Sequence, residues 1–206
     1  MRTFLLYGTH FLWGGLLGVG CFACFRGYRR RALAGQKLHS GPLRELALHF
    51  FVLWLFGTGA MILWPGYHFE TSGGLWGNLV VHNARESLVS NWNPVPFRMI
   101  ASYLRAFSRG HYRYAVTFFL GNILVFVPLG LLLPLLFSGY PAGKVTGVGL
   151  GISLGCECLQ FFLGRHCDVD DILLNTLGMS LGYALFLALR RLSPEFAKKF
   201  RCSEQT

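Results

Sequence analysis

The chain of 206 residues is long enough for one soluble domain, but 53% of its residues are hydrophobic, 16% are aromatic and only 14% are charged. Together with a mean hydropathy of +0.45, these values exclude an ordinary soluble protein and predict an integral membrane protein. The net charge of +10 does not indicate a nucleic-acid partner, because the lysines and arginines lie between apolar segments rather than along one polar face.

Several apolar runs approach the roughly 20 residues that a helix needs to cross a bilayer. In chain order they cover residues 3–25, 45–64, 115–137, 145–163 and 171–189. The sequence therefore predicts an all-α fold, a polytopic bundle of about five spanning helices that forms a single transmembrane domain over residues 1–206. Pro128 and Pro134 are expected to kink the third helix, and residues 65–114 are predicted to form a long outer loop.

The first run has a competing interpretation as a cleaved signal peptide, because residues 18–21 loosely resemble a lipoprotein cleavage site. Arg2 is the one basic residue ahead of the run, and the basic stretch 26–31 follows it like a stop-transfer sequence, which favours a retained helix. Cys21 and Cys24 have the spacing of a redox or zinc pair, but within an apolar run this spacing more often serves packing.

The basic residues predict the orientation of the chain. Segment 26–44, Lys144 and the tail from residue 190 together carry twelve lysines and arginines, whereas the predicted opposite side carries seven. Cationic loops are retained in the cytoplasm. We therefore expect the chain to lie in the cytoplasmic membrane with its N-terminus outside and its C-terminus inside, and residues 65–114 and 164–170 on the outer face.

The last predicted helix carries a polar and small-residue stripe. Asp171, Asn175, Gly178 and Gly182 are spaced 4, 3 and 4 residues apart, so they lie on one helix face, and Asp168 joins this face if the helix begins one turn earlier. The Gly178-x-x-x-Gly182 spacing allows two membrane helices to approach closely. The stripe is therefore predicted to face the interior of the bundle.

Two neighbouring helices bring further polar groups to a similar depth, namely Glu157 and Gln160 on the fourth helix and Asn122 on the third. An ionisable residue inside a membrane is costly and is a candidate functional residue. A structural alternative is that Glu157 forms an ion pair with Arg165. Asn122 and Asn175 could likewise have a structural role and form hydrogen bonds between helices.

The acidic loop also has structural interpretations. Asp168 and Asp170 could belong to a solvated loop, and Asp171 could complement the dipole of the last helix. His166 with Asp168 and Asp170 has residue types that bind metals, but the three are crowded into one short loop. No metal and no cofactor is therefore expected.

An ordered set of short motifs between residues 90 and 185 resembles the VanZ family of small bacterial membrane proteins. The set is formed by Asn93-Pro94-Val95-Pro96-Phe97, Asn122 with Phe126-Val127-Pro128-Leu129-Gly130, Glu157-x-x-Gln160, Arg165-x-x-Asp168-x-Asp170-Asp171, and Asn175-x-x-Gly178-x-x-x-Gly182. The resemblance implies a polytopic helical protein of the cell envelope, whose namesake is associated with resistance to the glycopeptide teicoplanin. It implies no particular reaction.

The motifs predict an outward-facing polar pocket that binds the headgroup of a membrane lipid or of a polyprenyl-linked envelope precursor. Its predicted residues are Asn93, Pro94, Pro96, Phe97, Asn122, Glu157, Gln160, Arg165, Asp168, Asp171 and Asn175. Arg165 would meet phosphate, and Phe97 would seat the outer turn against the bundle. The alternative is a membrane enzyme with Glu157 or Asp171 as general base. A proton-coupled transporter is less favoured, because the inner halves of these helices lack polar residues.

Overall fold

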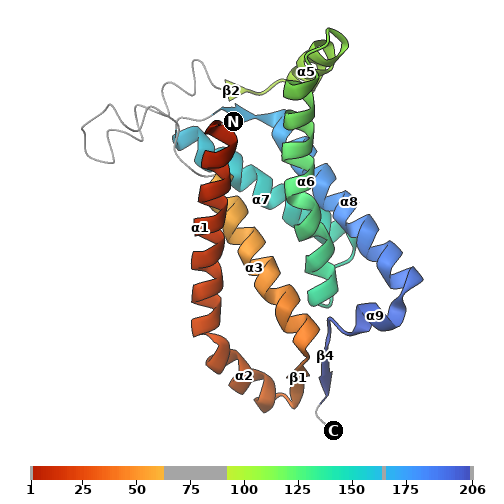
Figure 1. Cartoon of the computed structure of the whole chain (residues 1–206). Helices are drawn as coiled ribbons and strands as arrows, with labels where there is room; N and C mark the ends of the chain where they lie inside the picture. The colour runs from red at the N-terminus through yellow and green to blue at the C-terminus, as the bar shows by residue number, and fades with distance from the viewer. Residues whose placement is uncertain (1, 63–91, 164–165, 205–206) are drawn as a thin grey trace, which may run out of the picture. The chain divides into compact units, whose positions relative to one another are not determined.

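A computed structural model of the protein describes residues 2–62, 92–163 and 166–204. Most of the described residues lie in helices, and the strands are short (Figure 1). In chain order the elements are α1 (Arg2–Cys24), α2 (Arg26–Gly35), β1 (Leu38–Ser40), α3 (Pro42–Ile62), β2 (Trp92–Asn93), α5 (Arg98–Ser108), α6 (Tyr112–Leu136), α7 (Ala142–Phe162), β3 (Cys167–Asp168), α8 (Val169–Leu192), α9 (Pro194–Lys198) and β4 (Cys202–Glu204).

The helical fold predicted from the apolar runs is confirmed. The five predicted segments correspond to α1, α3, α6, α7 and α8, and their ends differ from the prediction by three residues at most. Within the described residues, α3, α7, α8 and residues 115–136 of α6 are each long and apolar enough to cross a membrane. Residues 8–24 of α1 meet the same test together with α2, from which they bend by 48°.

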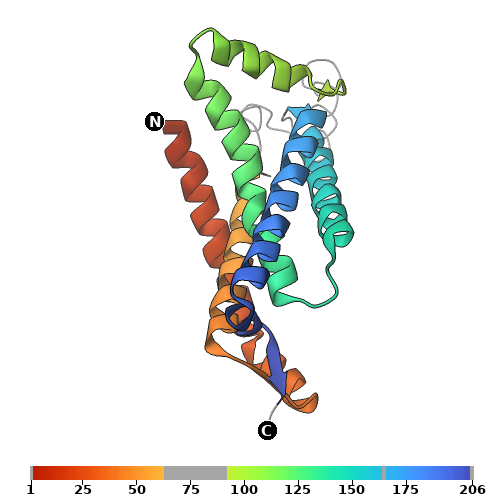
Figure 2. The same ribbon diagram turned by 90° about the vertical axis from the view of Figure 1, so that its right-hand side faces the viewer.

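The predicted long loop over residues 65–114, whose internal structure the sequence left open, contains a helix in its second half. Residues 98–108 form α5, which runs across the start of α6 rather than along its axis (Figure 2). Its residues 100, 103, 104 and 107 are apolar, which is the spacing of one helix face. The 11-residue helix α5 was not predicted because the prediction of helices relied on apolar runs of roughly 20 residues, and α5 contains no long apolar stretch.

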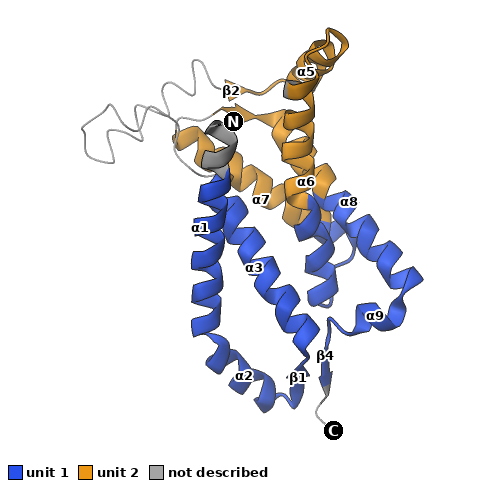
Figure 3. Cartoon of the chain, in the orientation of Figure 1, with its two compact units in different colours: residues 1–61, 127–145, 179–206 blue, residues 62–126, 146–178 orange. Residues whose placement is uncertain are grey.

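The chain divides into two compact units, which are coloured separately in Figure 3. Unit 1 contains residues 1–61, 127–145 and 179–206, and unit 2 contains residues 62–126 and 146–178. All predicted ligand-binding residues fall within unit 2 by their numbers. Unit 1 holds a hydrophobic core of leucines and phenylalanines that includes Leu48, Leu132, Leu135, Phe186 and Phe200.

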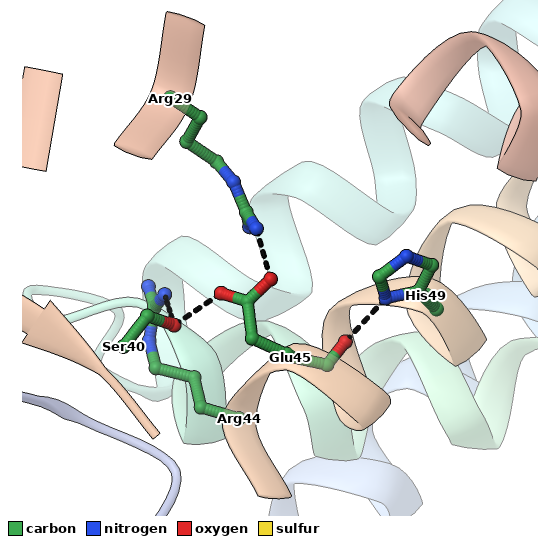
Figure 4. Close-up of polar contacts among 5 residues, drawn as sticks. All are labelled: Arg29, Ser40, Arg44, Glu45 and His49. Atoms are coloured by element: carbon green, nitrogen blue, oxygen red, sulfur yellow. Dashed lines mark hydrogen bonds and ion pairs between the residues drawn. The ribbon is translucent and has the colours of Figure 1, made fainter. Parts of the chain in front are cut away.

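Unit 1 also carries a polar network at the start of α3 (Figure 4). The Glu45 carboxylate accepts hydrogen bonds from Arg29 of α2 and from the hydroxyl of Ser40 in β1. Arg44 donates to the same Ser40 hydroxyl at 3.2 Å and to the carbonyl of Leu136 at 3.5 Å. A guanidinium at the carboxyl end of α6 complements the negative end of that helix dipole.

Two short strands also pair within unit 1. β1 pairs with β4 in antiparallel register, so that Leu38 faces Glu204 and Ser40 faces Cys202. Arg201, which directly precedes β4, donates to the carbonyl of Pro134 at 2.7 Å. The C-terminal segment is therefore fastened both to β1 and to the last turn of α6.

Candidate functional site

Unit 2 brings together polar residues from three helices and two strands. Asn122 comes from α6, Glu157 from α7 and Asn175 from α8, whereas Asn93 and Asp168 come from β2 and β3. The two strands pair in parallel over two residues, Trp92 with Cys167 and Asn93 with Asp168. A contact between segments 75 residues apart thus places the NPVPF turn beside the acidic loop.

Asp168 lies at the centre of this arrangement. Its Oδ1 accepts hydrogen bonds from the Asn93 side-chain amide at 3.0 Å and from the Asp170 backbone N–H at 2.9 Å. Its own N–H donates to Oε2 of Glu157 at 2.8 Å. Asn93 also accepts from the N–H of Val95 at 3.4 Å, which steadies the turn. Asn93, Glu157 and Asp168 are therefore connected by hydrogen bonds.

Glu157 is 4% exposed, although it is a carboxylate within a membrane-spanning helix. Among the described residues, no lysine or arginine forms an ion pair with it. The predicted partner, Arg165, lies outside the described residues. The backbone N–H of Asp168 donates to Oε2 of Glu157, and the Cys167 side chain also hydrogen-bonds to this carboxylate. Two such bonds leave part of the acceptor capacity of a carboxylate unused.

The polar stripe of α8 makes two contacts with neighbouring helices. Asp171 accepts from the Asn122 amide at 2.8 Å, and Asn175 donates to the Ser153 hydroxyl at 2.9 Å. Asn175 is buried and does not face the outside of the bundle. The predicted interior orientation of this stripe is confirmed.

Two buried side-chain acceptors lack a partner within the described parts of the chain. They are Oδ1 of Asn175 and Oε1 of Gln160. Gln160 donates through its Nε2 to the carbonyl of Ile62 at 3.1 Å, so its amide is held in one orientation. Buried amide oxygens are normally hydrogen-bonded, so these two atoms can take a ligand that presents hydroxyl, amide or ammonium donors.

The glycines below the polar residues bring α8 close to α6. In unit 2, a Cβ placed on Gly178 would lie 2.3 Å from the carbonyl oxygen of Ile123. In unit 1, a Cβ on Gly182 would lie 2.2 Å from the carbonyl oxygen of Val127. The close approach predicted from the Gly178-x-x-x-Gly182 spacing is therefore confirmed.

Asp170 has a role that the motifs did not indicate. It is fully buried, and its Oδ2 accepts from the backbone N–H groups of Met99 and Ile100 at 2.8 and 3.0 Å. Its Oδ1 accepts from the N–H of Phe97. Asp170 therefore caps the N-terminus of α5 from a segment about 70 residues away, as an N-terminal aspartate caps its own helix.

The interpretation of Asp168 and Asp170 as a solvated loop is wrong, because both side chains are buried. The expectation for Phe97 is also wrong, because its side chain is 63% exposed and does not seat the turn. Phe97 instead contributes its backbone, which adopts a left-handed conformation with φ of 65° and donates to Asp170. Pro94 and Pro96 are exposed as well.

The packing of the acidic loop perturbs the groups beside it. Burial raises the pKa of Asp168, although hydrogen bonds from the Asp170 N–H and from Asn93 oppose the rise. Burial, together with the negative charges of Asp171 and Asp168, raises the pKa of Tyr103 on α5. Burial and the adjacent Glu157 raise the pKa of Cys167 to about 12. Burial in this region thus favours the uncharged forms of Asp168, Cys167 and Tyr103.

No cluster of three or more histidine, cysteine, aspartate or glutamate side chains suited to a metal is found in the ranges that the structure describes. His166 is exposed, whereas Asp168 and Asp170 direct their oxygens to backbone and amide donors. These two carboxylates are thus engaged in holding the turn and α5.

A family model described as VanZ/LLP1 matches residues 51–190, which is more than half of the chain. The matched range includes every residue of the predicted site and also α5. Searches of curated proteins and of solved structures gave no match.

Proposed function

The chain belongs to the VanZ/LLP1 family, and we propose that it is a cell-envelope protein that recognises the headgroup of a membrane lipid or of a polyprenyl-linked envelope precursor. The observation that carries the proposal is the environment of Glu157. This buried carboxylate is hydrogen-bonded to Asp168 and Cys167 but forms no ion pair with a lysine or arginine among the described residues. A lipid headgroup can supply further hydroxyl, amide or ammonium donors to it.

The chemistry of the neighbouring groups favours a headgroup with hydroxyl, amide or ammonium donors. Asn175 and Gln160 each direct an amide oxygen into the buried region without a partner among the described residues. Sugar hydroxyls and acetamido groups carry such donors, and Arg165 is the residue proposed to meet the phosphate. By extension from the family's namesake, we propose that the protein lowers sensitivity to teicoplanin.

A second candidate function is a membrane enzyme that acts on the same class of headgroup. Glu157 is buried, whereas Asp171 is partly exposed and accepts from Asn122, so the two carboxylates occupy unlike environments. Such a pair can divide the roles of general acid and base. Turnover of a bound lipid by the purified protein would favour this candidate, and a bound lipid that remains unchanged favours recognition.

The binding proposal is tested by identifying the lipids that copurify with the protein. Glu157→Gln preserves an acceptor for the Asp168 N–H but removes the charge. We expect the variant to fold and to retain at least tenfold less copurifying lipid than wild type. Glu195→Gln is the matched control, because its side chain is 80% exposed. Equal lipid retention by wild type and Glu157→Gln, measured by mass spectrometry, would refute the role of Glu157.

The proposed orientation, with the N-terminus outside and the C-terminus in the cytoplasm, is tested by labelling with a membrane-impermeant maleimide. Cys167 is a poor reporter, because a pKa near 12 slows its reaction by roughly tens of fold relative to an ordinary thiol. A cysteine-free protein with His166→Cys should be labelled in intact cells, since residue 166 is exposed. Retaining Cys202 alone should give labelling only after lysis, and the opposite pattern would invert the orientation.

A further inference from the structure

The helix α5 has two chemically distinct faces. Ile100, Tyr103, Leu104 and Phe107 recur at the i, i+3, i+4 and i+7 spacing of one apolar face. Arg98 and Arg105 are seven residues apart and lie on the opposite face. An apolar face of this kind must be covered by protein or by lipid.

The protein covers only one edge of this apolar face. The Tyr103 ring stacks on Phe118 of α6, with ring centroids 4.1 Å apart. Leu104 and Phe107 remain 55% and 46% exposed, and Phe107 packs edge-to-face against Tyr112, which is itself exposed. Three large apolar side chains thus form an uncovered patch at the junction of α5 and α6.

The charge around the patch identifies its partner. Between residues 98 and 113 the chain carries Arg98, Arg105, Arg109 and Arg113 and no aspartate or glutamate. All four arginines are exposed. A basic amphipathic helix with aromatic and leucine side chains on its other face is suited to the surface of an anionic bilayer, where arginines meet phosphates and the apolar face enters the acyl boundary.

The structure also holds α5 in a fixed place. Asp170 accepts the N–H groups of Phe97, Met99 and Ile100, so the first turn of α5 is fastened to the start of α8. At its other end α5 is followed within four residues by α6, a candidate membrane span. A helix secured at both ends beside two spanning helices is held at the level where those spans emerge from the bilayer.

We propose that α5 is an interfacial helix that binds an anionic lipid surface, with Leu104, Phe107 and Tyr112 in the acyl boundary and Arg105 and Arg109 at lipid phosphates. This inference goes beyond the headgroup site proposed above. It requires only that the membrane around the protein contain anionic lipid, and it is independent of which ligand Glu157 binds.

Site-directed fluorescence tests the depth of the helix. Leu104→Cys in a cysteine-free protein carries a bimane label, and the protein is reconstituted into vesicles of phosphatidylcholine and phosphatidylglycerol with brominated acyl chains. We expect quenching at residue 104 to exceed that of the matched label Ser102→Cys, on the polar face, at least twofold. Equal quenching at the two positions would overturn the proposal. A residue 104 label shielded from both bromolipid and aqueous iodide would also overturn it, because a protein partner would then cover the patch.

The anionic preference is tested with the same label in vesicles of phosphatidylcholine alone. Quenching at residue 104 is expected to fall when phosphatidylglycerol is omitted. In an Arg105→Gln, Arg109→Gln variant the difference between the two vesicle types should shrink by at least half. Unchanged quenching at residue 104 without phosphatidylglycerol would overturn the proposed preference of α5 for anionic lipid. Lipid retention by Glu157 is measured separately, so failure here leaves the headgroup proposal intact.

Discussion

A Gly178→Ala variant is expected to lose about 1 to 3 kcal/mol of the free energy of unfolding, because the added methyl group overpacks a close helix crossing. The Cβ would lie 2.3 Å from the carbonyl oxygen of Ile123 and 3.1 Å from the Cβ of Phe126. The carbonyl belongs to the backbone of α6 and cannot rotate away, so relief requires α6 and α8 to separate within unit 2. An SDS titration followed by circular dichroism measures the loss.

The matched control is Gly155→Ala, which makes the same chemical change within the neighbouring spanning helix α7. A Cβ on Gly155 would meet nothing within 4 Å. Because alanine favours helix more than glycine does, this variant should be as stable as wild type or more stable by up to about 1 kcal/mol. If both variants lost the same stability, the close approach at Gly178 would not be the cause.

Features that lie within one helix could be predicted from the sequence. The five long helices follow from the length of their apolar runs, and the Asp171, Asn175 and Gly178 stripe follows from the helical period. Both depend on residues close together in the chain. The resemblance of the ordered motifs to a family placed Asn93, Glu157 and Asp168 in one predicted site, and the structure joins these three residues by hydrogen bonds. Their action on a common ligand stays a prediction.

Features that depend on distant segments could not be predicted in the same way. The parallel pairing of β2 with β3 spans only two residues on each side, and β1 pairs with β4 over three residues at opposite ends of the chain. Strands this short have no alternating pattern long enough to recognise. The helix α5 is different, because its i, i+3, i+4, i+7 pattern is present in residues 100–107 and a search for short amphipathic helices would find it.

The role of Asp170 illustrates the same limit. In sequence it is one of several acids ahead of an apolar run, a position that is typical of a solvated loop or of a first-turn acid. Its three donors belong to residues 97, 99 and 100, and nothing in either segment indicates the other. Burial distinguishes the interpretations, because a fully buried carboxylate must be matched by donors.

Replacing Asp170 is expected to release α5 from the rest of unit 2. Asp170→Ala removes the acceptor of three backbone N–H groups at a buried helix N-terminus, so we expect a loss of about 2 to 4 kcal/mol. Asp170→Asn keeps an acceptor oxygen but directs an amide donor at one of these N–H groups, and should cost about 1 to 3 kcal/mol. The SDS titration described for Gly178 should rank the free energies of unfolding, with wild type the most stable, the Asn variant next and the Ala variant the least stable.

A local measurement separates the capping role from a general loss of packing. Hydrogen exchange of the amides of residues 97–100 should accelerate in Asp170→Ala before the amides of α7 or α8 do, because the lost acceptor serves only the first turn of α5. The exposed Glu195→Gln substitution should alter neither the SDS midpoint nor the exchange rates. If exchange accelerated equally along α5, α7 and α8, Asp170 would stabilise the whole of unit 2 rather than anchor one helix.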